Sequence, residues 1–180
     1  IDSGAFGDAR FLVIQMVAND RDPRLQPYLD DLQNLCNRHR GRVVVFTRSV
    51  GPTYFDLLAG STWTVWPSQY EPFGSVSESY IFGTPAIVRA TGGLVQQLVD
   101  LDDDPIHGTG KAYREAVSGI RNIEEAWRRI QLAEGPNQRR EMSLYNSMVI
   151  SLAGVIGNAA RLSSHSRNLY GNVLLNVYAK

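Results

Sequence analysis

Runs of apolar residues alternate along the first 100 positions with segments in which apolar residues recur at helical spacing. The apolar runs are typical of strands buried on both faces, at residues 11–17, 42–47, 62–66 and 86–89. Between them, helical patterns or short helix signals occur at residues 25–40, 52–58, 75–82 and 94–99. Strands that alternate with helices predict right-handed crossovers and a parallel sheet flanked by helices, which is an α/β fold.

After Asp100 the pattern predicts helices rather than strands. The expected helical segments are residues 111–119, 122–133 and 137–162, with a last apolar pattern at Leu169, Val173, Leu174 and Val177. Gly135-Pro136 is the strongest break in this half of the chain. We therefore expect a lobe over residues 1–135, incomplete at its N-terminus, and a C-terminal helical extension over residues 136–180.

Composition narrows the classes of function. Lys+Arg and Asp+Glu number 18 each, so the net charge is zero, which argues against a nucleic-acid or membrane-surface role. No apolar run approaches the length of a membrane span. The single cysteine, Cys36, is expected to be a small core residue, with a reactive thiol as the alternative, and is compatible with a reducing compartment such as the cytoplasm.

The stretch from Pro67 to Pro85 carries the densest candidate chemistry. It follows a predicted strand, and ligands of open parallel sheets bind beyond the carboxyl ends of strands. Glu71 lies in this loop, and Gly74 allows a close approach of the backbone to a ligand. Ser75 and Val76 fall in the first turn of the next helix, where free N–H groups favour a phosphate.

The same residues have an interpretation that needs no ligand. Ser75 and Glu78 have the spacing of a capping box, in which a serine and a glutamate satisfy the N–H groups at the start of a helix. Ser77 is a second possible cap. The residues alone leave the ligand site and the helix cap as open alternatives.

This stretch is one of several short motifs that occur along the chain in a recognisable order. They are Pro67-Ser68-Gln69-Tyr70-Glu71-Pro72-Phe73-Gly74, Gly83-Thr84, Val88-Arg89 and Thr91-Gly92-Gly93-Leu94, with Asp22-Pro23 and Gly41-Arg42-Val43 before them and Thr109-Gly110 after them. This order resembles the donor-binding lobe of retaining glycosyltransferases built from two Rossmann-like lobes, near the glycogen and starch synthases. The resemblance covers residues 8–115 and implies a Rossmann-like parallel sheet for this lobe.

The resemblance implies roles for the residues of the loop. Glu71 would face the transferred sugar and stabilise the positive charge that develops at its anomeric carbon. Phe73 and Gly74 would line the sugar and the phosphate, and the amides of Ser75 and Val76 would hold the distal phosphate.

Two further donor contacts follow from the resemblance. Glu78 would bind the ribose, a match that requires the loop after Gly74 to be one residue shorter than in the family. Arg48 and Ser49 stand where many synthases place a tyrosine near the nucleotide base. Arg48 could stack on the base through its flat guanidinium group, or it could be a solvated loop charge, and both interpretations stay open.

The function implied is transfer of glucose, or another hexose, from ADP-glucose or UDP-glucose to a glucan-like acceptor with retention, without a cofactor. The basic residues that bind the diphosphate and the acceptor lobe are expected to precede Ile1, so we expect the isolated chain to be inactive. One alternative is a non-catalytic domain that binds a nucleotide sugar or serves as an assembly surface. A sugar-nucleotide epimerase on the same fold is disfavoured by the ordered motifs.

The remaining polar residues favour structural interpretations. His39, His107 and His165 are scattered without the spacing of metal ligands. The acidic run 102–104 is expected to be a solvated loop rather than a metal cluster. Trp63 and Trp66 lie on a predicted strand and are expected to pack in or beside the core.

Overall fold

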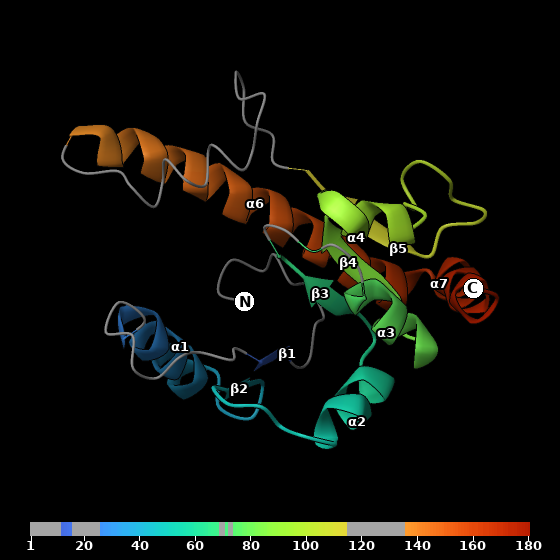
Figure 1. Cartoon of the computed structure of the whole chain (residues 1–180), viewed down its shortest axis with the longest axis horizontal. Coiled ribbons are helices and arrows are strands. Elements are labelled where there is room, and N and C mark those ends of the chain that lie inside the picture. Colours follow the sequence, from blue (N-terminus) through green and yellow to red (C-terminus); the bar gives the residue numbers. More distant parts are fainter. Residues whose placement is uncertain (1–11, 16–25, 69–70, 72–73, 115–135) are drawn as a thin grey trace. The chain divides into compact units, whose positions relative to one another are not determined.

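The computed structural model describes residues 12–15, 26–68, 71, 74–114 and 136–180 (Figure 1). The chain divides into two compact units, one formed by residues 8–57 and one that contains residues 58–180. Each unit is described by itself. Gly135, where the domain boundary is predicted, lies outside the described residues, so that boundary stays a prediction.

The unit of residues 8–57 is a strand–helix–strand segment. The strands β1 (Leu12–Gln15) and β2 (Val43–Phe46) pair in parallel, and the helix α1 (Gln26–Arg38) connects them. The predicted helix and the second predicted strand are confirmed here. Cys36 is half-buried on α1 and its thiol is free.

The unit of residues 58–180 contains a parallel sheet of three strands in the order β3-β4-β5. The strands are β3 (Thr64–Trp66), β4 (Ala86–Arg89) and β5 (Gly110–Tyr113). The helices are the end of α2 (Thr53–Gly60), which spans the boundary of the two units, together with α3 (Ser75–Ile81), α4 (Gly92–Gln97), α6 (Pro136–His165) and α7 (Arg167–Tyr178). The expected α/β class and the parallel pairing are confirmed.

Residues 110–113 form a strand, so the prediction of a helix from residue 111 was wrong. Lys111 stands on this strand with only 7% of it exposed. Its ammonium group lies 2.5 Å from a carboxylate oxygen of Asp102, which lets a charged residue stand on a buried strand. The next predicted helix, at residues 122–133, lies outside the described residues.

Helices cover both faces of this sheet. One face buries Ala86 and Val88 against Val76 of α3 and Leu94 of α4. The other face contributes Ile87 and Tyr113 to a second cluster, which α6 completes with Leu152, Val155, Ile156 and Ala159. The spacing of these α6 residues places them on one side of the helix, so α6 packs along the sheet through a single apolar stripe.

The C-terminal helix α7 covers the amino edge of the same sheet. It confirms the predicted apolar pattern, because Val173 and Val177 are buried. Its polar contacts go to the segments that precede the strands: the hydroxyl of Tyr170 donates to the carbonyl of Thr62, 2.7 Å away, just before β3. No helix among the described residues is long and apolar enough to cross a membrane.

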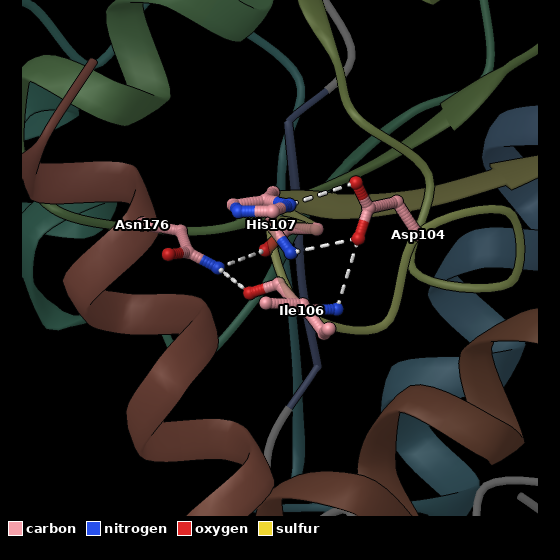
Figure 2. Close-up of polar contacts among 5 residues, drawn as sticks. Asp104, Ile106, His107 and Asn176 are labelled. Carbon is pink, nitrogen blue, oxygen red and sulfur yellow. Dashed lines mark hydrogen bonds and ion pairs between the residues drawn. The ribbon is translucent and has the colours of Figure 1, made fainter.

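The contacts of α7 continue before β4 and β5. The ring of Tyr178 lies over Gly83, where an added Cβ would stand 2.4 Å from the ring. The side-chain amide of Asn176 donates to the carbonyls of Ile106 and Gly108, at 2.8 and 3.2 Å (Figure 2). One helix therefore holds the amino ends of all three strands, and the opposite, carboxyl edge is left to the loops that follow them.

Candidate functional site

The loop after β3 meets the start of α4 at the carboxyl edge of the three-stranded sheet. Strands β3 and β4 are parallel neighbours, so the chain leaves both of them at this edge. The amide of Gly93, after β4, donates a 2.9 Å hydrogen bond to the carbonyl oxygen of Glu71, after β3. The structure thereby brings together the Glu-Pro-Phe-Gly and Thr-Gly-Gly-Leu segments, which the sequence separates.

Glu71 is half-buried in the loop after β3. Its backbone is held by Gly93, while its carboxylate makes no hydrogen bond or ion pair with any described residue. Phe73, the neighbour that was predicted to line the sugar, lies outside the described residues.

Gly74 decides how α3 begins. It occupies the N-cap position with φ 127° and ψ −54°, a conformation that residues with a side chain rarely adopt. Ser75 is therefore the first helical residue rather than the cap, and no side chain caps α3. The capping box of Ser75 and Glu78, and the capping role of Ser77, are consequently wrong.

Of the residues predicted to bind phosphate, Ser75 is the more accessible. Ser75 is 8% exposed, whereas Val76 is fully buried in the core beneath the sheet. The N–H groups of a first helical turn have no acceptor within the helix, so they suit an anion in principle. Glu78 is exposed on the same helix, one turn further on.

Gln97, which the sequence did not single out, links α4 to the start of α3. Its side-chain oxygen accepts from the amide of Gly74 at 3.3 Å and from the hydroxyl of Ser77 at 3.1 Å. Its side-chain nitrogen donates to the carbonyl of Gly93 at 2.8 Å. Two glutamines, Gln96 and Gln97, follow Thr-Gly-Gly-Leu and could have suggested a polar link to a neighbouring segment. Helical spacing alone does not say which of the two faces inward.

Arg48 and Ser49 belong to the unit of residues 8–57. They follow β2 at its carboxyl end and are exposed. The hydroxyl of Ser49 accepts from the amide of Gly51 at 3.4 Å, within a local turn. Their part in donor binding stays a prediction.

The acidic loop before β5 uses its carboxylates locally. Asp102 pairs with Lys111, and one oxygen of Asp104 accepts from the amides of Ile106 and His107 at 3.0 Å each (Figure 2). The other oxygen of Asp104 lies 2.9 Å from Nδ1 of His107. The backbone hydrogen bond from His107, above all, lowers the pKa of Asp104. In the described part of the chain, no three Asp, Glu, His or Cys side chains are grouped as metal ligands would be.

Sequence comparison agrees with these motifs. Over 99 residues the chain is 33% identical to the probable glycogen synthase of Methanocaldococcus jannaschii, an alignment that covers 54% of this chain and 18% of that protein. Over 123 residues it is 33% identical to the glycogen synthase of Paracidovorax citrulli, covering 61% of this chain and 24% of that protein. This chain is related in sequence to the glycogen synthases. The resemblance that the motifs indicated is confirmed.

The chain spans only about a fifth to a quarter of the length of these two glycogen synthases. No family profile matches it. Among solved structures, the sucrose-phosphate synthase of Thermosynechococcus elongatus aligns with a TM-score of 0.42 and 19% identity, covering 93% of this chain and 38% of that one.

Proposed function

We propose that the chain is the donor-binding part of a retaining glycosyltransferase. The reaction would move glucose, or another hexose, from ADP-glucose or UDP-glucose to a glucan-like acceptor. The observation that carries this proposal is the hydrogen bond from Gly93 to Glu71, because it joins the two segments that resemble the glycogen synthase donor loop. The relation in sequence to glycogen synthases supports the choice of reaction.

Glu71 is the residue for which we propose a catalytic role. When the glycosidic bond to the diphosphate breaks, positive charge develops on the anomeric carbon and the ring oxygen of the sugar. A fixed carboxylate beside that carbon stabilises the charge, and it does so more strongly where the surroundings exclude water. The half-buried position of Glu71 and its held backbone suit this role.

The departing diphosphate needs hydrogen-bond donors of its own, and we expect these at the start of α3. Backbone amides act here without moving during the reaction, which is how fixed dipoles lower a barrier. We assign the distal phosphate to the amides of Ser75 and Val76, with Gly74 and Phe73 lining the sugar and phosphate. The greater exposure of Ser75 suggests that it makes the closer contact. Glu78 would bind the ribose, and Arg48 and Ser49 the base.

The test is a calorimetric and NMR titration of the 180-residue chain with ADP, UDP, ADP-glucose and UDP-glucose. We expect a high micromolar to millimolar affinity, about 4–6 kcal/mol, and shifts of the amide signals of Glu71, Gly74 and Ser75. Glu71→Gln should weaken the binding of the sugar nucleotides more than that of ADP or UDP. Asp103→Asn removes one exposed negative charge from the loop before β5 and is the matched control.

Two results decide between the proposal and its rival. If none of the four nucleotides shifts these signals, the donor site is misplaced and the proposal fails. If the chain binds them but transfers no sugar even when an acceptor-binding lobe is supplied, a non-catalytic nucleotide-sugar-binding or assembly domain is the correct description.

A further inference from the structure

We infer that Gln97 is a positioning residue that fixes the backbone of Gly74 directly and that of Glu71 through Gly93. This inference rests on the donor-binding role proposed for Glu71 and Gly74. Gln97 need not touch the donor, because it acts through the backbone of two other residues. Its side chain is half-buried at the end of α4, on the side that faces the loop after β3.

Gln97 holds Gly74 directly. The amide of Gly74 points its N–H at the side-chain oxygen of Gln97, 3.3 Å away. The bond therefore holds the amide of a residue whose positive φ, 127°, is a conformation that glycine adopts readily. The hydroxyl of Ser77 donates to the same oxygen at 3.1 Å, so the acceptor is shared between the cap and the first turn of α3.

Glu71 is held through Gly93. Gln97 donates from its nitrogen to the carbonyl of Gly93 at 2.8 Å, and the amide of Gly93 donates to the carbonyl of Glu71 at 2.9 Å. A carboxamide is the group that can do both, because it carries an acceptor and a donor on one carbon. A change at residue 97 should therefore reach Glu71 through its backbone, since Gln97 bonds to Gly93 and Gly93 bonds to Glu71.

The adjacent residue supplies a matched control. Gln96 precedes Gln97 on α4 and is exposed. Replacing either glutamine by methionine keeps the length of the side chain and removes its hydrogen bonding. Gln97→Met therefore removes the links to Gly74 and Gly93, whereas Gln96→Met changes helix propensity and surface polarity alone. Gln97→Glu keeps an acceptor for Gly74 but loses the donor to Gly93.

The experiment has one arm without a ligand and one with ADP, UDP and their glucose conjugates. Without ligand, amide hydrogen exchange should accelerate at Gly74 by about tenfold in Gln97→Met, as expected when one hydrogen bond is lost, and stay unchanged in Gln96→Met. With ligand, affinity should fall by about tenfold in Gln97→Met, measured at a temperature where the variant is still folded. Gln97→Glu should keep Gly74 protected and bind less tightly than Gln96→Glu, which adds the same charge to the same helix without breaking the link to Gly93.

The outcomes separate this inference from the proposed function. If the unmodified chain binds none of the nucleotides, the donor-binding role of Glu71 and Gly74 is wrong and the inference falls with it. If it binds them and Gln97→Met binds equally well, only the role of Gln97 is wrong. Should Gln97→Met fail to fold, Gln97→Glu decides: native affinity in that variant contradicts the inference.

Discussion

Gly110 lies directly against Ala86 in the parallel pairing of β4 and β5, and an added Cβ would stand 2.2 Å from the Ala86 carbonyl oxygen. Neither Gly110 nor the carbonyl group of Ala86 can move away without breaking the pairing of β4 and β5, which are both buried. We therefore expect Gly110→Ala to lower the free energy of unfolding by at least about 2 kcal/mol, as overpacking of a rigid core does. Urea unfolding followed by circular dichroism measures this.

Gly154 provides the opposite case for the same substitution. It lies on α6, is exposed, and an added Cβ there would meet no atom within 4 Å. Gly154→Ala should raise the free energy of unfolding by about 0.5–1 kcal/mol, because glycine costs that much in a helix. Equal effects of the two substitutions would mean that the close approach at Gly110 is not real.

The sequence predicted the elements whose pattern is local. The predicted strand 86–89 coincides with β4, and the predicted helix 75–82 differs from α3 by one residue. The apolar recurrence at Val173 and Val177 marked the buried side of α7. In β4 and α7 the buried apolar positions follow the strand or helix pattern, so periodicity was a sufficient guide there.

The errors arose where a residue distant in sequence changes the meaning of a local pattern. Lys111 can stand on a buried strand because Asp102 neutralises it, and the spacing of the two does not reveal the pair. Ser75 has the spacing expected of an N-cap, but Gly74, with its positive φ, occupies the N-cap position. The role of Gln97 depends on its hydrogen bond with Gly74, which precedes it by a helix and a strand. Helical periodicity does not reveal a contact so distant in sequence.

The hydrogen bonds of Asn176 should hold the loop before β5. Asn176→Ala removes an exposed hydrogen bond to the carbonyl of Ile106 and a partly buried one to the carbonyl of Gly108. We expect a loss of about 1–2 kcal/mol in the free energy of unfolding and faster amide exchange at Ile106 and His107. Asn172→Ala, an exposed position on the same helix, is the control. Identical exchange in the two variants would show that Asn176 does not hold this loop.

Tyr80 should make stability depend on pH in alkaline solution. Burial raises its pKa to about 12, an effect that the hydrogen bond to Thr109, 2.7 Å long, opposes in part. In the unfolded chain a tyrosine loses its proton near pH 10. The stabilisation is therefore complete below about pH 10 and is lost as the pH rises towards 12, by up to about 1.4 kcal/mol per pH unit.

Tyr80→Phe tests that dependence. Phenylalanine cannot ionise, so the decline in the free energy of unfolding above about pH 10 should become shallower, although not flat. Tyr170 contributes in the same direction, because burial raises its pKa to about 12 as well. Urea unfolding at several alkaline pH values gives the slopes. A slope that Tyr80→Phe leaves unchanged would mean that this phenol ionises equally in the folded and unfolded chains.

The last prediction concerns the division of the donor between Glu71 and Glu78. Because Glu78 takes no part in a capping box, Glu78→Gln should leave the free energy of unfolding unchanged within about 0.5 kcal/mol. If Glu78 binds the ribose, the same variant should lose about 1.5–3 kcal/mol of affinity for all four nucleotides, the scale of a hydrogen bond to a charged group. Titration calorimetry and urea unfolding separate the two quantities.

Glu71→Gln should behave differently in an assay of sugar transfer. A residue that stabilises charge developing on the sugar matters more in the transition state than in the bound donor, so kcat should fall by a larger factor than KM for the donor rises. Glu78→Gln should instead raise KM, because the ribose is bound equally in both states. The proposed division of the donor would not survive the reverse pattern, with Glu71→Gln raising KM alone and Glu78→Gln lowering kcat.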